Sequence, residues 1–131
     1  MTGLILAAGA STRLGEAKQL LVYQGQTLLE RSIRLAFSVC KEVVVCLGAE
    51  VEQTVPIIQS LKVEFPTLSY LEVVNWEKGM GESLSVGLRT IDQNKDVLVL
   101  LCDLPFLTNA HMKNIISLAN SERAIVASFQ G

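Results

Sequence analysis

The chain has 131 residues, of which 50% are hydrophobic and 18% are charged, and its formal net charge is −2. This length predicts a single domain over residues 1–131, with enough chain to bury one core. The slight acidic balance, without a run of like charge, argues against nucleic-acid and membrane partners, and no apolar run is long enough to span a bilayer.

Three cysteines, Cys40, Cys46 and Cys102, occur in no C-x-x-C motif. Their odd number and irregular spacing indicate neither a disulfide framework nor a zinc site, so we expect free buried thiols in a reducing compartment. No signal peptide precedes the first apolar run, and the cytoplasm is therefore the expected location.

In chain order, continuous apolar runs predict strands at residues 2–7, 42–47, 69–74, 96–102 and 124–128. Helical periodicity alternates with them, after residue 27 and over residues 50–62, 82–91 and 108–119. Thr27 and Glu30 have the spacing of a capping box at the first of these helices. Pro56 leaves two alternatives, the first turn of a short helix or a kink within a longer one.

This alternation predicts an α/β fold: an open, mostly parallel sheet of about five strands with helices on both faces, a Rossmann-like arrangement of three layers. The third strand is the least hydrophobic and is expected near an edge of the sheet. In such folds, ligands bind at the carboxyl ends of the strands. The segments that follow the first, third and fourth strands are therefore the candidates for a functional site.

The loop after the first strand has residues suited to a polyphosphate. It reads Leu6-Ala7-Ala8-Gly9-Ala10-Ser11-Thr12-Arg13-Leu14-Gly15-Glu16-Ala17-Lys18. Glycine permits close backbone approach, and successive N–H groups form an anion site. Arg13 adds a forked donor and Lys18 a point charge. The patterns of a P-loop and of a dinucleotide-binding loop do not fit. An ordinary Gly-rich turn with two solvated cations is the alternative.

A second candidate segment follows the third strand, where Gly79 and Gly81 bracket a turn before a helix expected to begin at Glu82 or Ser83. A helix start offers unpaired N–H groups to an anionic or polar ligand, and Ser83 adds a hydroxyl. A Gly-rich helix cap without a ligand is the alternative. Trp76 is expected to pack rather than to stack on a base.

The third candidate is Asp103, which directly follows the fourth strand. A carboxylate at this place needs a cation or hydrogen-bond donors, and Mg²⁺ takes one or two carboxylates together with phosphate oxygens. Capping of a local turn is the alternative. His111, early in the last predicted helix, is expected at the surface or as a cap rather than in catalysis.

These segments contain the patterns A-A-G-x-S-x-R-x-G-x-x-K, G-M-x-x-S-L-x-x-G and C-D-x-P, in one order over residues 2–128. Together they resemble the molybdenum cofactor cytidylyltransferases. The resemblance implies a fold like that of the nucleotide-diphospho-sugar transferases. It also implies Mg²⁺-dependent transfer of CMP from CTP to the terminal phosphate of molybdopterin, the molybdenum cofactor, with release of pyrophosphate.

By this resemblance, the catalytic residues are Arg13, Lys18 and Asp103, of which Asp103 is the metal ligand. The nucleotide-binding residues are Leu6, Ala7, Ala8, Gly9, Ala10, Ser11, Thr12, Arg13, Lys18, Gly79, Met80, Gly81 and Ser83. Two alternatives stay open. One is a guanylyltransferase using GTP on the same acceptor, although such enzymes usually carry L-A-G-G at the first loop. The other is a nucleotide-binding module or fragment without catalysis.

The family continues through a Gly-His-Pro-type segment and further carboxylates, so we expect the domain to be incomplete at its C-terminus. An uncovered fifth strand would favour association. A homo-oligomer and a contact with a molybdoenzyme or chaperone are therefore both open.

Overall fold

The computed structural model describes residues 1–8, 20–49, 51–92, 94, 96–102 and 124–127. Within them, five strands form one sheet in the order β5-β4-β1-β6-β7, and every neighbouring pair is parallel. The strands are β1 (Thr2–Ala7), β4 (Glu42–Leu47), β5 (Leu68–Glu72), β6 (Val97–Leu101) and β7 (Ala124–Ala127). The open parallel sheet expected from the sequence is confirmed, with β1 at its centre and β5 at an edge.

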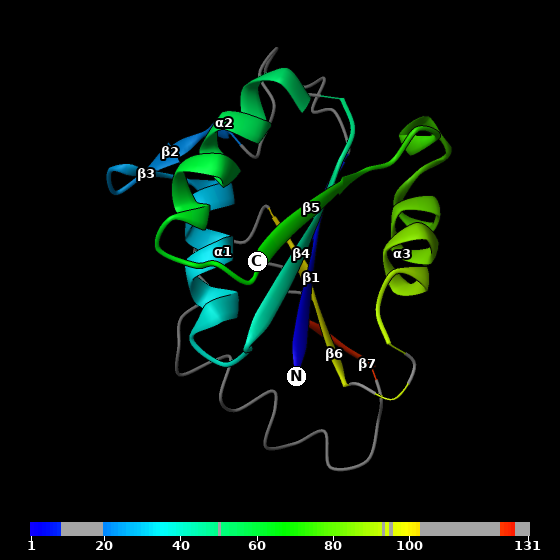
Figure 1. The fold of residues 1–131 in the computed structure, drawn as a ribbon. Coiled ribbons are helices and arrows are strands. Elements are labelled where there is room, and N and C mark those ends of the chain that lie inside the picture. The colour runs from blue at the N-terminus through cyan, green and yellow to red at the C-terminus, as the bar shows by residue number, and fades with distance from the viewer. Residues whose placement is uncertain (9–19, 50, 93, 95, 103–123, 128–131) are drawn as a thin grey trace.

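Helices cover both faces of this sheet (Figure 1). The helices α1 (Leu28–Phe37) and α2 (Val51–Lys62) lie on one face, and α3 (Met80–Arg89) lies on the other. Along β1, Ile5 and Ala7 pack toward α1 and α2, whereas Leu4 and Leu6 pack on the side of α3. Burial on both faces explains why the strands are continuously apolar, and the three-layer arrangement is confirmed.

Helix α1 begins as its sequence predicts. The backbone N–H of Glu30 donates to the side-chain oxygen of Thr27 at 3.1 Å, which is the N-cap half of the expected capping box. In α2, Pro56 lies inside the helix, so the longer of the two alternative helices is present. A small hairpin, β2 (Val22–Tyr23) and β3 (Gln26–Thr27), precedes α1. Its two-residue strands are too short to leave a periodic pattern.

Three expectations about elements need correction. Helix α3 begins at Met80 rather than at Glu82 or Ser83, because Gly79 adopts a φ of 105° and ends the preceding turn there. Strand β5 is Leu68–Glu72 rather than residues 69–74, and Val74 is 83% exposed. Leu88, which helical spacing over residues 82–91 places on one face with Leu84 and Ile91, is 36% exposed, whereas Ile91 is 8% exposed.

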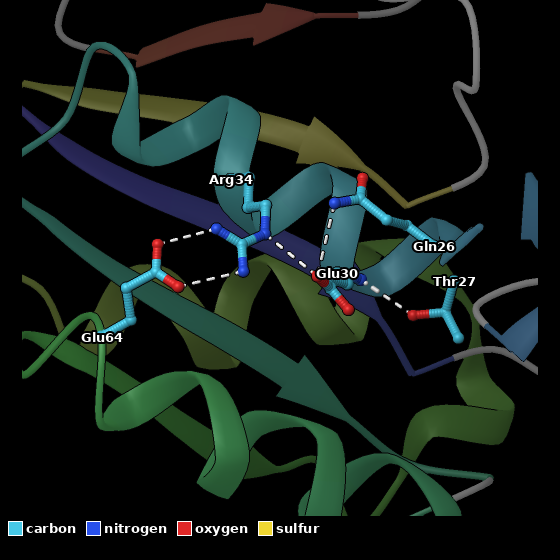
Figure 2. A network of polar contacts seen from close by, with 5 residues as sticks. All are labelled: Gln26, Thr27, Glu30, Arg34 and Glu64. Carbon is cyan, nitrogen blue, oxygen red and sulfur yellow. Dashed lines mark hydrogen bonds and ion pairs between the residues drawn. The ribbon is translucent and has the colours of Figure 1, made fainter. Parts of the chain in front are cut away.

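A polar network fastens α1 to the turn that follows α2 (Figure 2). Arg34 donates two hydrogen bonds to Glu64, at 2.7 and 3.0 Å, and a third to Glu30 at 3.0 Å. The guanidinium lowers the pKa of the Glu64 carboxyl through these hydrogen bonds. The rings of Phe37 and Phe65 stack beside it, with centroids 4.4 Å apart. The Arg34–Glu64 ion pair therefore joins α1 to the turn after α2 at the surface of this helical layer.

As expected, Cys40, Cys46 and Cys102 are buried thiols, and none of them is part of a disulfide. Among the described residues, no helix has the length and hydropathy needed to cross a membrane.

Candidate functional site

The first candidate segment begins at the carboxyl end of β1. Leu6, Ala7 and Ala8 are buried there, with the strand flanked by β4 and β6. The rest of the loop lies outside the described residues, from Gly9 through Ala10, Ser11, Thr12 and Arg13 to Lys18. The structure therefore fixes where the candidate phosphate loop departs from the sheet.

The turn after the neighbouring strand β4 contacts Ala8, the residue at which the loop leaves the sheet. The backbone N–H of Ala49 donates to the carbonyl oxygen of Ala8 at 2.9 Å. A Cβ placed on Gly48 would lie 2.6 Å from this same oxygen and 2.7 Å from Cβ and Cγ of Trp76. Gly48 is thus enclosed between the start of the loop and Trp76.

The second candidate segment starts at Trp76, in the short 3-10 helix η2 (Trp76–Lys78), and runs into α3. The N–H of Gly79 donates to the carbonyl of Trp76 at 3.0 Å, and Gly79 then forms the N-cap of α3. Its positive φ is one that L side chains rarely adopt, which accounts for a glycine at this point. Gly79 and Gly81 are exposed, whereas Ser83 is 4% exposed. Gly79 and Gly81 therefore present exposed backbone at the start of α3, whereas the N–H of Glu82 is already bonded to the carbonyl of Gly79 at 3.2 Å.

Close packing holds α3 against the sheet. The thiol of Cys46 donates to the carbonyl oxygen of Ser83 at 3.6 Å, and burial raises the pKa of this thiol to about 11. One turn further on, a Cβ at Gly87 would lie 2.7 Å from Cδ1 of Leu4 and 2.9 Å from Sγ of Cys46. The missing side chain lets α3 approach β1 and β4 closely, so the first turn of α3 rests on a rigid support. Trp76 packs on the same apolar cluster, as expected.

The third candidate segment leaves the sheet at β6. The N–H of Cys102 donates to the carbonyl of Leu6 at 3.4 Å, and the hydroxyl of Ser32 in α1 donates to the carbonyl of Cys102 at 3.4 Å. Asp103 is the next residue and lies outside the described part of the chain, as does His111. The backbone that leads into Asp103 is thus held next to the end of β1.

The structure brings the starts of all three segments to one edge of the sheet. Ala8 and Trp76 meet across Gly48, and Cys102 pairs with Leu6 on the opposite side of β1. In the described residues, no group of three or more His, Cys, Asp or Glu side chains forms a metal site. Among the described residues, the groups at this edge that can donate to a ligand are backbone N–H groups at the start of α3; Arg13, Lys18 and Asp103 lie outside the described residues.

Sequence reasoning missed the turn at Gly48 and Ala49. A signal was available: Gly48 directly follows the apolar run at residues 42–47. This run forms β4, the neighbour of the strand that leads into the phosphate loop.

Comparison with known proteins gives relatives of two kinds. Nicotine blue oxidoreductase from Paenarthrobacter nicotinovorans is 39% identical over 112 residues, which are 82% of this chain and 52% of that protein. A probable molybdenum cofactor guanylyltransferase from Bacillus cytotoxicus is 27% identical over 134 residues, covering 100% of this chain and 63% of the relative. The chain thus spans roughly half to two thirds of the length of these relatives.

Solved structures share the fold. The crystal structure of Rv0371c from Mycobacterium tuberculosis superimposes with a TM-score of 0.69 at 28% identity, covering 89% of this chain and 58% of that one. A second structure of the same protein, a complex with manganese, gives a TM-score of 0.62 at 25% identity over 89% of this chain and 57% of that one.

The sequence also matches the MobA-like NTP transferase domain over residues 3–131, nearly its whole length. The parallel sheet and its helical layers have the fold of the nucleotide-diphospho-sugar transferases. The chain belongs to the family of MobA-like NTP transferase domains.

Proposed function

We propose that this chain forms one NTP-transferase domain of a nucleotidyltransferase that uses CTP. It transfers CMP to the terminal phosphate of molybdopterin, the molybdenum cofactor, and pyrophosphate leaves. Family membership supports the reaction class, and the guanylyltransferase relatives support the acceptor. The observation that carries the proposal is the convergence of Ala8, Trp76 and Cys102 at one edge of the sheet.

In this proposal, the loop after β1 holds the triphosphate. Backbone N–H groups from Ala8 to Thr12 surround the phosphate oxygens, Arg13 donates to them in pairs, and Lys18 adds positive charge. The same two cations stabilise the departing pyrophosphate. The acceptor phosphate is already ionised and attacks the α-phosphorus directly, so alignment and charge neutralisation supply most of the rate.

The base and ribose belong at the start of α3. The exposed Gly79 and Gly81 allow a planar base to approach the backbone, and the N–H groups of Met80 and Gly81 in the first turn give polar donors. Ser83 lies one turn into this helix and stays a predicted contact. The rigid support beneath α3, at Gly87 and Cys46, keeps this surface in place while nucleotide binds.

A divalent cation fits the donor set that the proposal places here. Asp103 follows Cys102, whose N–H is paired with the carbonyl of Leu6, and the proposal therefore places one carboxylate near the loop that follows β1. One carboxylate with phosphate oxygens is a donor set that Mg²⁺ takes. When bound, such an ion neutralises charge on the phosphates. The manganese complex of Rv0371c supports a divalent ion, and Mg²⁺ is our choice among such ions.

The choice of base separates two versions of the proposal. Ala8, where guanylyltransferases usually have glycine, and the pattern from Gly79 to Gly87 favour CTP. The relatives named guanylyltransferase favour GTP. We retain CTP as the first choice and GTP as the alternative that the experiment must separate.

Two rival functions remain in view. One is nucleotide binding without transfer. The other is raised by the relative named nicotine blue oxidoreductase, because a dinucleotide cofactor also presents a diphosphate to such a loop. An oxidoreductase would bind NADH or NADPH more tightly than any nucleoside triphosphate.

The test is a thermal-shift panel with CTP, GTP, ATP, UTP, NADH and NADPH, each with and without Mg²⁺. A ligand at a hundredfold excess over its Kd stabilises the native state by about 2.7 kcal/mol. We expect the largest rise in Tm with CTP and Mg²⁺. We expect Asp103→Asn to lose the Mg²⁺-dependent part of that rise.

The matched control is Asp96→Asn, at the opposite end of β6, which should keep the whole shift. A largest shift with GTP would select the alternative base, and one with NADH or NADPH would contradict the proposal. A second assay adds molybdopterin and follows pyrophosphate. CTP binding without pyrophosphate release would leave a binding module, not a transferase.

A further inference from the structure

We propose that Gly48 is a positioning residue that sets the spacing between the phosphate loop and the nucleoside segment. This inference rests on the proposed function, because it concerns the same nucleotide site. Gly48 itself has no side chain to offer a ligand. It acts through the two groups that enclose it, the carbonyl of Ala8 and the side chain of Trp76.

The contacts at Gly48 are closer than a side chain would tolerate. A Cβ there would lie 2.6 Å from the oxygen of Ala8, and Cβ atoms in proteins essentially never come within 3.0 Å of such neighbours. The oxygen belongs to the backbone and is already bonded to the N–H of Ala49 at 2.9 Å. This oxygen therefore cannot move away from a new methyl group by the rotation of a side chain.

The backbone conformation of Gly48 does not require glycine, since its φ lies outside the positive range found at Gly25 and Gly79. The close approach of its neighbours is the remaining reason for a glycine. This distinguishes Gly48 from Gly79, where the conformation itself selects the residue.

The two neighbours begin the two halves of the proposed site. Ala8 is the last described residue before the phosphate loop, and Trp76 opens the turn that leads to Gly79 and α3. A methyl group at Gly48 would push both outward. The triphosphate and the base would then no longer fit the site at the same time, so the distance between the halves depends on this one missing side chain.

The test is Gly48→Ala, with Gly3→Ala as the matched control. A Cβ at Gly3 would meet Ala36 Cβ and Val43 Cγ2 at 3.3 Å, at the amino end of the sheet and away from the site. We expect Gly48→Ala to weaken binding of CTP with Mg²⁺ by at least about tenfold, as a misplaced binding group does. Gly3→Ala should bind within about twofold of the wild type. Equal affinity of folded Gly48→Ala and the wild type would overturn the proposal.

A double-mutant cycle with Trp76→Gly separates positioning from general damage. Removing Cβ and Cγ of Trp76 relieves the clash of the new methyl group with Trp76 and leaves the one with the Ala8 oxygen, so Gly48→Ala should weaken binding less, though not negligibly, in the Trp76→Gly background. We expect a coupling of at least about threefold in Kd. Additive effects would contradict the role. Where Gly48→Ala alone is too unstable to bind nucleotide, the same cycle is read from Tm, and additive losses of Tm from the two substitutions would contradict the role too.

A measurement without ligand keeps this inference apart from the proposed function. We call the contacts of Gly48 with Ala8 and Trp76 the junction. Trp76 is the single tryptophan, so its fluorescence reports on this junction directly. Gly48→Ala should shift the emission of Trp76 and speed hydrogen exchange at the Ala49 amide, and Gly3→Ala should do neither. If the wild type binds no nucleotide while these shifts occur, the proposed function fails and the junction stands. If neither readout changes, the junction itself is wrong.

Discussion

The two ends of the sheet are held together in different ways. Backbone hydrogen bonds join neighbouring strands at both ends, for example from Thr2 to Asp96 at the amino end and from Ala49 to Ala8 at the carboxyl end. At the amino end, side-chain hydroxyls add to them: the hydroxyl of Thr2 donates to the Glu42 carboxylate at 2.9 Å, and the hydroxyl of Thr67 donates to the carbonyl of Lys41 at 2.6 Å. At the carboxyl end, the contact from Ala49 to Ala8 lies at Gly48, which leaves no room for a side chain.

This difference supports the proposal that the nucleotide binds at the carboxyl end. Side-chain hydrogen bonds between strands, as at the amino end, stabilise the fold. A backbone contact that excludes even a methyl group, as at Gly48, fixes the path of the chain where the proposed phosphate loop leaves the sheet.

The largest expected effect is a loss of activity without a loss of stability, from a substitution in the loop that follows β1. Arg13→Ala should lower the rate of nucleotidyl transfer more than about tenfold, because a charge-assisted donor to the phosphates is lost. The fold should survive, with an unchanged circular dichroism spectrum. The control is Arg34→Ala, which removes an arginine from the surface of α1 and should leave the rate unchanged. Equal rates in the two variants would break the distinction between the ends.

A smaller effect is expected on stability, from two glycines of the same helix. Gly81→Ala should stabilise the protein by about 0.5–1 kcal/mol, since its Cβ would meet nothing within 4 Å and alanine favours helix. Gly87→Ala should destabilise it by about 1 kcal/mol, because crowding against the buried Leu4 outweighs the same helical gain. Urea unfolding measures both. Changes of the same sign would show that α3 is not seated as tightly as described.

At the amino end, Thr2→Val should destabilise the protein by about 1 kcal/mol. It removes the hydroxyl that donates to Glu42 while keeping the shape of a side chain that is 2% exposed. Nucleotide affinity should stay as in the wild type, which calorimetry can check. Weaker CTP binding in this variant would mean that the two ends are coupled.

The buried thiols of Cys40 and Cys46 make the free energy of unfolding depend on pH in the alkaline range. Burial raises the pKa of Cys40, near the amino end, and of Cys46, under α3, from 9.0 to about 11. The unfolded chain therefore loses these protons first. Their contribution to stability is complete below pH 9 and falls as the pH rises toward 11.

Urea midpoints measured across that range should decline, and Cys46→Ala should decline less steeply because one titrating thiol is gone. An equal slope in this variant would show that Cys46 does not titrate as described.

The smallest expected effect is at the Arg34–Glu64 pair. The pKa of Glu64 is lowered by its hydrogen bonds from Arg34, so the stabilisation is present at neutral pH and is lost as the pH falls through that lowered pKa. Both side chains are partly exposed, and solvent screens the pair. Glu64→Gln should lower Tm by no more than about 3 °C at neutral pH. A much larger fall would place this network among the main supports of the fold.

Much of the fold could be predicted because it is written in local patterns. The apolar runs at Thr2–Ala7 and Glu42–Leu47 give β1 and β4 with the bounds that the structure shows. The start of α3 was wrong because a glycine at residue 81 argues against helix, whereas the conformation of Gly79 decides where the helix begins.

The sequence could indicate three candidate segments, but not the contacts that join their starts. The parallel topology indicates that strand ends meet at one edge, and the structure confirms this for Ala8, Trp76 and Cys102. The junction at Gly48 depends on three residues far apart in sequence. There, a few tenths of an ångström in the separation of two atoms decide whether a side chain fits. No spacing pattern carries that information, so the sequence could not reveal it. Arg13, Lys18 and Asp103 lie outside the described residues, and their roles stay predictions.

The central claim, that the carboxyl end of the sheet is the nucleotide site, can be tested directly by NMR. A ¹⁵N-labelled chain would be titrated with CTP and Mg²⁺ while all amide signals are followed. We predict that the shifts concentrate at Leu6–Ala8, Gly48–Ala49 and Gly79–Ser83, and that Thr2, Lys41 and Asp96 stay unchanged. Shifts centred on the amino end would contradict the account, as would a titration that moves no amide at all.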